Sequence, residues 1–240
     1  MANLLRMRGA LALALAVAVL SPLLSGCAGD EPTVALLVAD GADAVHVVDT
    51  EAFEARVRAT CDGCSVTVYD AEGDAALQKS QARQAEAESA DVLVVVPIEP
   101  DDLESLTQDE VPVVSLGTLV PGAERHVGLQ QPADAQGDAD SDLAAARELI
   151  LGDRSSMTYV PTVDMSEQAA DVAVALLADT PVPEGAVAAE EVEGVESWLF
   201  TTQDVTLDTL TTLLVGQGVL TLDELCEGRT AEKCAKLGLR

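Results

Sequence analysis

The chain has 240 residues and is strongly acidic, with 42 Asp and Glu residues against 13 Lys and Arg, which gives a formal net charge of −29. A chain with this charge does not bind nucleic acid through its phosphates, and an anionic lipid surface repels it unless acyl chains hold it there. We interpret the acidity itself as a feature of solubility and genomic composition.

The first 26 residues have the features of a secretory signal. Arg6 and Arg8 form a short basic stretch, and Gly9–Leu24 consists almost entirely of apolar and small residues. This run is too short and too rich in alanine for a membrane span. We therefore predict a signal peptide over residues 1–26 and an extracytoplasmic protein.

The end of this signal, Leu24–Cys27 (LSGC), resembles the lipobox of bacterial lipoproteins. The resemblance implies that Cys27 is acylated and becomes the first residue of the mature chain, with residues 27–32 as a tether. The protein is then expected on the extracytoplasmic face of the cell membrane, with the membrane as its partner through the lipid on Cys27. The alternative is an ordinary secretory signal in which Cys27 has no role.

Four further cysteines form two local pairs, Cys61 with Cys64 and Cys226 with Cys234. In an exported protein such pairs predict two structural disulfides. A thioredoxin-like redox motif is the alternative for the first pair, but that motif requires a helix N-terminus, and this pair follows a helix. We expect neither a metal site nor a cofactor, because nothing links the two pairs and the two histidines lack ligand spacing.

Strands and helices are expected to alternate along residues 33–240, which predicts a Rossmann-like, doubly wound parallel α/β sheet. Asp91–Pro97 (DVLVVVP) has the composition of a strand buried on both faces, and we expect it to lie beside Thr33–Ala39. The other expected strands are Ser65–Asp70, Val111–Leu116, His126–Leu129, Met157–Val160 and Trp198–Thr202. The expected helices are Thr50–Thr60, Asp74–Glu88, Asp101–Thr107, Leu143–Leu151, Met165–Ala178 and Leu207–Val215, and a capping box at Thr221 opens a further short helix. Residues 130–142 and 182–194 are expected to be loops.

An ordered series of stretches is similar to the xylose-type sugar-binding lipoproteins of ATP-driven (ABC) importers, which have the type I periplasmic-binding-protein fold. The series includes Phe53–Cys64, Tyr69–Ala76, Gln78–Gln84, Asp91–Pro97, Val113–Ser115, Gln136–Ala139, Gln168–Leu177 and Thr202–Gly218. In that family two lobes are hinged around a sugar, whereas here the chain passes from Gly128 to Gln136 with no room for most of the second lobe. Met157–Leu177 resembles the strand and helix that return to the first lobe. We therefore expect essentially one lobe over residues 33–240, in which residues 130–142 replace most of the second.

Candidate ligand-binding residues are Asp40, His46 and Asp138. The first two follow the first strand at the carboxyl edge of the sheet, where ligands of α/β folds bind, and Asp138 stands where the family has a binding aspartate. A buried, hydrogen-bonded histidine is the alternative for His46, because its neighbours are apolar. Ala44–Val48 and Leu116–Thr118 replace the arginine, the aromatic residues and the Tyr-Asp-Arg-like turn of the family. The chain has one Trp, two Tyr and two Phe, so an aromatic platform for a sugar is poorly supplied.

Two functions are consistent with these features of the sequence. The first is an envelope interaction or accessory protein with lost or altered ligand binding, for which Ala44–Val48 is a candidate contact surface for a protein partner or a homodimer. The second is a working component of an ABC importer that binds a small sugar and a permease, with a second copy in place of the lost lobe. We predict no enzyme, because no Gly-rich phosphate loop or nucleophile elbow is present. Acid pairs such as Asp101–Asp102 and Glu190–Glu191 are interpreted as solvated surface.

Overall fold

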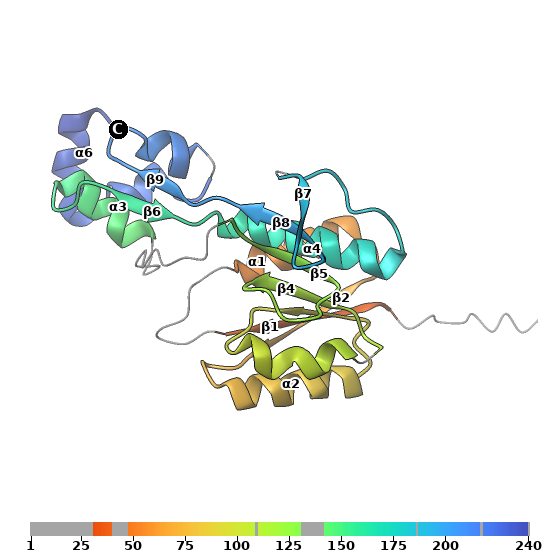
Figure 1. The fold of residues 1–240 in the computed structure, drawn as a ribbon. Coiled ribbons are helices and arrows are strands. Elements are labelled where there is room, and N and C mark those ends of the chain that lie inside the picture. Colours follow the sequence, from red (N-terminus) through yellow and green to blue (C-terminus); the bar gives the residue numbers. More distant parts are fainter. Residues whose placement is uncertain are drawn as a thin grey trace, which may run out of the picture. The chain divides into compact units, whose positions relative to one another are not determined.

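The computed structural model describes residues 31–39, 48–108, 110–130, 142–185, 187–216 and 218–239. These residues form a seven-stranded sheet with the order β2-β1-β3-β4-β5-β8-β7 and a separate two-stranded sheet of β6 and β9 (Figure 1). Within these ranges, no helix combines the length and the apolar composition that crossing a bilayer requires. The predicted α/β class with a parallel central sheet is confirmed.

The larger sheet is parallel except at one edge. Its strands are β1 (Thr33–Val38), β2 (Ser65–Asp70), β3 (Val92–Val95), β4 (Val113–Gly117), β5 (Arg125–Leu129), β7 (Ala189–Val192) and β8 (Val195–Phe200). Only β7 runs antiparallel, as a hairpin with β8. Every residue of β3 is buried, and β3 pairs with β1 on one side and β4 on the other. The prediction of an inner strand buried on both faces beside Thr33–Ala39 is therefore confirmed.

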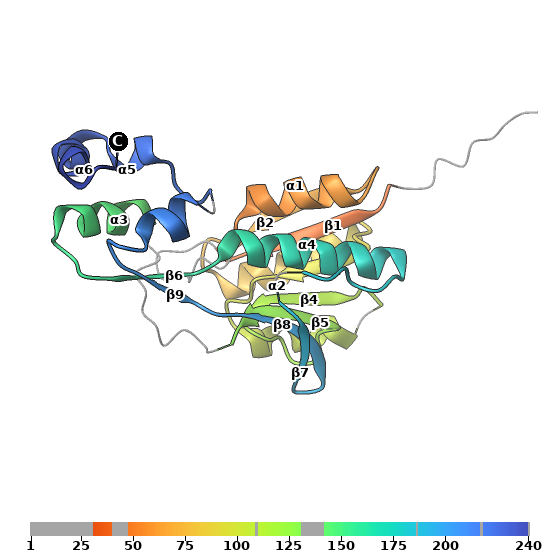
Figure 2. The same ribbon diagram turned by 90° about the horizontal axis from the view of Figure 1, so that it is seen from above.

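Helices cover both faces of this sheet because successive strand residues point to opposite sides. The helices on one face are α1 (Thr50–Thr60) and α4 (Thr162–Ala178), and those on the other are α2 (Ala75–Ala87) and the 3₁₀ helix η1 (Pro100–Gln108) (Figures 1 and 2). Leu36 and Val94 pack against Phe53 of α1 on the first face. Leu37 and Leu93 pack against the opposite helices. We call this sheet and its four helices the large region.

The second sheet belongs to a small region with a hydrophobic core of its own. Its elements are α3 (Asp142–Leu151), β6 (Met157–Tyr159), β9 (Gln203–Val205), the π-helical turn η2 (Thr211–Val215), α5 (Leu222–Leu225), the 3₁₀ turn η3 (Gly228–Thr230) and α6 (Ala231–Leu237). The strand at Met157, which resembles one returning to the first lobe, pairs antiparallel with β9 instead of joining the larger sheet. The helix that follows it, α4, does pack on the larger sheet.

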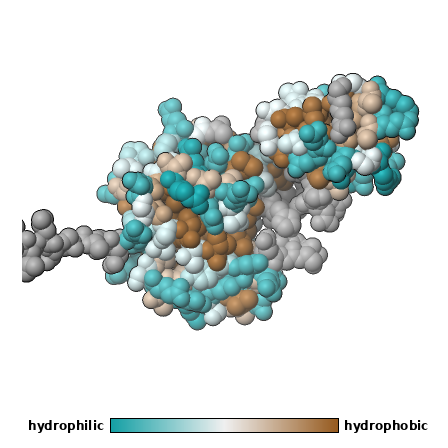
Figure 3. All heavy atoms as spheres, turned by 180° about the vertical axis from the view of Figure 1, so that it is seen from behind, coloured by the Kyte–Doolittle hydropathy of each residue, from teal (hydrophilic) through white to brown (hydrophobic). Residues whose placement is uncertain are grey.

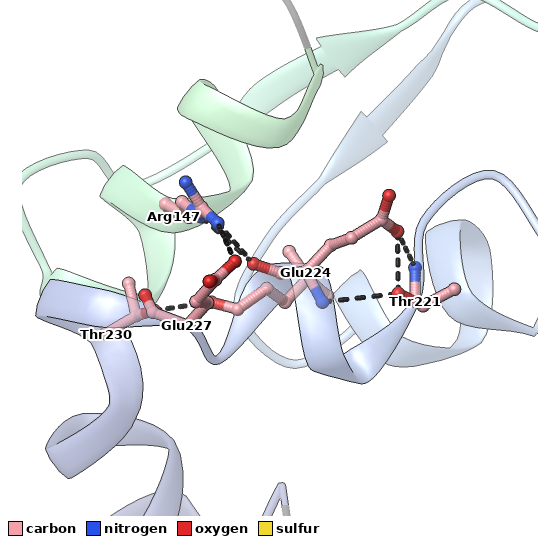
Figure 4. A network of polar contacts seen from close by, with 6 residues as sticks. Arg147, Thr221, Glu224, Glu227 and Thr230 are labelled. Atoms are coloured by element: carbon pink, nitrogen blue, oxygen red, sulfur yellow. Dashed lines mark hydrogen bonds and ion pairs between the residues drawn. The ribbon is translucent and has the colours of Figure 1, made fainter.

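Polar and covalent links hold the short elements of the small region together. Arg147 of α3 donates to the Glu224 carbonyl through Nε at 3.1 Å and Nη2 at 2.6 Å (Figure 4). Thr221 and Glu224 form the predicted capping box at the start of α5. Cys226 and Cys234 are buried and joined as a disulfide. The other pair, Cys61 and Cys64, is joined between α1 and β2 in the large region.

Two segments differ from expectation. Residues 182–194, expected as a loop, contain β7; three of its four residues are exposed, so the strand has no buried alternation that the sequence could reveal. The helix expected from Leu207 is instead a turn followed by η2, in which the Gly216 N–H donates to the Thr211 carbonyl at 2.8 Å. A Cβ at Gly216 would lie 2.5 Å from the Thr212 oxygen, so glycine suits this wider, π-type ending.

Candidate functional site

The carboxyl edge of the larger sheet is the candidate site, because α/β folds bind ligands where parallel strands end. Strands β1, β3, β4, β5 and β8 are parallel and end at this edge. Of the described residues that follow the parallel strands there, most are apolar or small (Ala39, Pro97, Ile98, Gly117, Thr118, Thr201 and Thr202), and Glu72, Glu99 and Gln130 are the polar ones. The edge therefore offers few side chains that could orient a polar ligand.

The loop after β3 is held in place by Gln78 of α2, which is 1% exposed. Its Nε2 donates to the Val96 carbonyl at 2.7 Å, and its Oε1 accepts from the Ile98 N–H at 3.0 Å. Both ends of the amide are thus used within the chain. The resemblance includes Gln78 but assigns it no role; the structure shows that it fixes the segment leaving the central strand.

Two long helices begin at the same edge and are tied together there. Asp49 caps α1 by accepting from the Ala52 N–H at 2.8 Å, and its own N–H donates to Ser166 Oγ at 2.7 Å. Ser166 Oγ in turn donates to the Thr162 carbonyl in the first turn of α4. The link therefore fixes the N-cap of α1, three residues after the predicted residue His46.

Four predicted site residues lie outside the described residues: Asp40, His46, Asp138 and the lipidation site Cys27. The candidate contact surface Ala44–Val48 also lies outside them except for Val48, which packs at the border of the α1-side core. These assignments stay predictions. At the carboxyl edge, the structure brings together residues that hold the loops and helices in place, such as Gln78, Asp49 and Ser166.

A buried serine–histidine pair lies on β4 and β5. Ser115 Oγ and His126 Nδ1 are 3.0 Å apart, and His126 Nδ1 is 3.2 Å from the Ser115 carbonyl oxygen. Ser115 is 0% exposed and His126 is 4% exposed, so neither can reach a substrate. Burial lowers the pKa of His126 to about 4, and the imidazole is neutral at pH 7. We interpret this pair as part of the core.

The ring of His126 lies over Gly128, on the same strand. A Cβ at Gly128 would collide with the imidazole and would lie 2.8 Å from the Gly117 carbonyl oxygen. Glycine at this position therefore allows the histidine to be buried at the end of the strand. Among the described residues, no group of three or more His, Cys, Asp or Glu side chains could hold a metal ion.

All five aromatic residues of the chain lie in the described ranges, and none presents an open ring at the carboxyl edge. Phe53, Tyr159, Trp198 and Phe200 are each at most 4% exposed. The fifth, Tyr69, is the penultimate residue of the edge strand β2 and lies near the carboxyl edge. Its half-buried ring packs against the core on the α2 face, and its hydroxyl donates to Glu88, the C-cap of α2, at 2.7 Å. Binding proteins stack sugars on aromatic faces, and here those faces are packed against the protein itself.

The chain is similar in structure to ABC-transporter solute-binding proteins. One is from Clostridium phytofermentans with bound β-D-glucose, with a TM-score of 0.62 at 12% identity over 80% of this chain and 99% of that one. Another, from Chloroflexus aurantiacus in complex with D-glucose, has a TM-score of 0.61 at 12% identity over 81% of this chain and 97% of that one. A chain of the TorS sensor domain–TorT complex, solved in the absence of ligand, has a TM-score of 0.55 at 9% identity over 73% of this chain and 92% of that one.

Comparison of the sequence with protein-family models and with curated proteins finds no match. The structural likenesses, at this level of identity, establish the fold. The chain has the fold of the type I periplasmic binding proteins, of which it contains essentially one lobe.

Proposed function

We propose that this chain is a lipid-anchored, extracytoplasmic protein in which the solute-binding fold has lost or altered its sugar site and serves as an envelope interaction or accessory protein. The observation that carries the proposal is the placement of the aromatic side chains. Four are almost fully buried, and the half-buried ring of the fifth, Tyr69, packs against the core with its hydroxyl bonded to Glu88, so no ring stands open for stacking on a sugar. Without stacking, a monosaccharide loses the contact that gives such sites much of their affinity.

The size of the small region supports the same proposal. Its described residues form a two-stranded sheet and helices of at most ten residues, whereas the resemblance implies a second lobe that closes over the ligand. Arg147, a cation of this region that could bind a hydroxyl or a carboxylate, donates instead to the Glu224 carbonyl and lies 3.9 Å from Glu227. Arg147 and the Thr221–Glu224 capping box thus bond to other residues of the small region.

The solved structures support both candidate functions. The glucose-bound neighbours favour a working importer component that binds a sugar and a permease. The TorS–TorT complex, solved without ligand, shows that a chain of this fold occurs in a complex with a sensor domain. An interaction role therefore needs no change of fold.

Thermal unfolding of the mature protein in 10 mM of each of a panel of pentoses and hexoses tests the loss of the sugar site. We expect no rise in the unfolding temperature with any sugar. A sugar present at about 100 times its Kd stabilises a protein by about 2.7 kcal/mol, so a rise of several degrees would support the importer component.

The anchor has a separate test, because it depends only on Cys27. Cell fractionation of the wild type and of Cys27→Ser should find the wild type with the membrane and the variant released from it. A variant that stays in the membrane fraction would contradict acylation of Cys27, and it would leave the result of the sugar panel unaffected.

A further inference from the structure

The opposite, amino edge of the larger sheet carries hollows that the carboxyl-edge site does not explain. One, which we call the apolar groove, has a volume of about 560 Å³ and lies between the C-terminal part of α4, the segment that follows it, and strands β5, β7 and β8. Its apolar lining includes Leu176, Pro181, Val182, Val187, Ala188 and Trp198. Arg125, Thr180, Glu184 and Glu196 also line it, so the groove beside the β7–β8 hairpin combines apolar and charged lining.

Two buried donors at this groove have no hydrogen-bond acceptor. The Nε2 of Gln168, a residue that is 3% exposed, has none, and its carboxamide lies directly against Gly185, which lines the groove. The Nε of Arg125, which also lines the groove, is 3.1 Å from Glu196 Oε2 but is not aligned with it as a hydrogen bond. Both donor atoms are buried, so neither is open to a bound segment in this structure.

Carboxylates surround the mouth of the groove. A second hollow of about 630 Å³ beside it is lined by Glu124, Glu190, Glu191 and Glu196, together with Arg125. We call these four glutamates the acidic rim. Arg125 is already in ion-pair contact with Glu124 and Glu196. The acidic rim repels an anionic bilayer and favours a partner with Lys or Arg side chains.

The hairpin also offers main-chain groups. Among the described residues, strand β7 ends the order of the sheet and pairs only with β8, so no described strand covers the other side of its backbone. An open edge strand can pair with an extended segment of another chain. The groove would then take one apolar side chain of that segment, and the acidic rim its basic ones.

The amino edge is also the edge at which the predicted tether joins the fold. Strand β1 begins there at Thr33, six residues after Cys27, and a stretch of six residues spans at most about 20 Å. If Cys27 is acylated, as proposed above, this edge stays close to the membrane surface. An extracytoplasmic segment of a membrane protein is then within reach of it.

We propose that the apolar groove, the acidic rim and the open edge of β7 form a docking site for an extended, Lys- or Arg-bearing extracytoplasmic segment of a membrane protein. The apolar groove anchors one side chain, the open edge of β7 pairs with the main chain of the segment, and the glutamates pair with the basic residues. This role rests on the proposed envelope function and specifies the surface through which that function is exerted.

Photo-cross-linking in the cells that produce the protein tests the docking site. The full chain carries p-benzoylphenylalanine at Ala188, which is exposed at the groove, or at Thr67, exposed on the edge strand β2 at the other end of the sheet. Hydrophobic surface is visible on the face of the protein seen from behind (Figure 3). Val68, the residue next to Thr67 on β2, is an exposed apolar side chain. The control position thus tests whether an open, partly apolar edge is sufficient by itself.

We expect Ala188 to cross-link to one membrane protein at a segment that contains Lys or Arg, and Thr67 to give no such product. The double variant Glu190→Lys/Glu191→Lys should lower the cross-linking yield about tenfold, because it replaces two attractive charges with repulsive ones. Asp101→Lys/Asp102→Lys, an equally exposed acid pair on η1, should leave the yield unchanged.

Several results would overturn the docking site. They are a yield at Ala188 no higher than at Thr67, a product that contains a second copy of this chain, a cross-linked segment without basic residues, or equal yields for the two charge-reversed variants. Circular dichroism confirms that the variants are folded, and Ala188→Arg, which blocks the groove without touching the core, should abolish the product if a variant of the rim does not fold. Release of the Cys27→Ser variant is measured separately, so a failed anchor and a failed docking site give different results.

Discussion

The large and small regions are held together in different ways. The large region has a continuous sheet with hydrophobic cores on both faces, and its central strand is buried at every residue. The small region has a three-residue strand pair, helices of four to ten residues, a buried disulfide and an arginine that crosses from α3 to α5. Small units bury a smaller share of their surface, so they depend more on covalent and polar links.

This difference indicates what has been retained in the chain. The large region has the complete lobe of a binding protein, including covered faces and tied helix starts. The small region has a closed core of its own, and most of its charged side chains, such as Asp223, Glu227 and Lys236, are exposed. Changes to the two regions should therefore have separable effects, and the following predictions test that separation.

The largest effect is expected from Phe53→Ala. Phe53 is 0% exposed and lies between α1 and the sheet. Its truncation should lower the free energy of unfolding by about 3–5 kcal/mol. Hydrogen exchange followed by mass spectrometry should show lost protection in β1, β3 and α4, with that of α6 largely kept. The matched change Leu237→Ala, at a side chain that is 39% exposed, should have little effect, and equal losses in both regions would contradict the separation.

Acid should destabilise the large region first. The pKa of His126 is about 4 in the folded chain because of burial, against an ordinary value of 6.5, so below pH 6.5 the unfolded chain binds a proton that the folded chain does not. The stability that this histidine contributes is complete above pH 6.5 and is lost as the pH falls to about 4, up to about 3 kcal/mol. The small region has no histidine in its described ranges.

Denaturant titrations at pH 7 and pH 4.5 check this dependence. The difference in unfolding free energy between the two pH values should shrink in His126→Gln, in which no imidazole titrates. An unchanged difference would show that other groups account for the acid sensitivity.

Removal of the Cys226–Cys234 disulfide should affect the small region. Opening its loop should cost about 2.5 kcal/mol, by the loop-length estimate. The double variant Cys226→Ala/Cys234→Ala should lose exchange protection in α5 and α6 while β1 and β3 keep theirs. Cys61→Ala/Cys64→Ala is the control in the large region, where the shorter loop predicts about 2 kcal/mol and changes confined to the junction of α1 and β2. Loss of protection throughout the chain in the first variant would contradict separate regions.

The smallest effect is expected at the capping box. Thr221→Ala removes the hydroxyl that accepts from the Glu224 N–H at 3.2 Å, which should destabilise α5 by about 1 kcal/mol. Thr221→Ser keeps the hydroxyl and should restore most of the loss. The hydrogen bonds from Thr221 also lower the pKa of Glu224, so a chemical-shift titration should find a higher pKa for this carboxyl in the alanine variant.

The large region was predictable from the sequence because its signals are local. The apolar runs at Thr33–Ala39 and Asp91–Pro97 predict buried strands, and Asp49 and Asp74 are recognisable helix caps in the structure. Strand β7 could not be predicted, since an exposed edge strand has no hydrophobic alternation. The pairing of β6 with β9 joins residues almost 50 positions apart, and nothing near either strand in the sequence indicates it.

The candidate site was less predictable than the fold. Gln78, which fixes the loop after β3, and the Ser115–His126 pair act through contacts between residues of different elements, which no local pattern encodes. The apolar groove is lined by residues far apart in the sequence, among them Arg125, Leu176 and Trp198. The composition did indicate the poor supply of aromatic residues, and the structure shows that all five rings pack against the protein itself.

Isothermal titration calorimetry of the mature protein with pentoses and hexoses tests the central claim, that the fold has been kept while the sugar site has been lost or altered. With protein at about 100 µM and each sugar titrated to 10 mM, we predict no saturable heat. The glucose-bound solute-binding protein from Clostridium phytofermentans is the positive control for the method. Saturable binding of any sugar with a micromolar Kd would contradict the claim and identify the chain as a working sugar-binding protein.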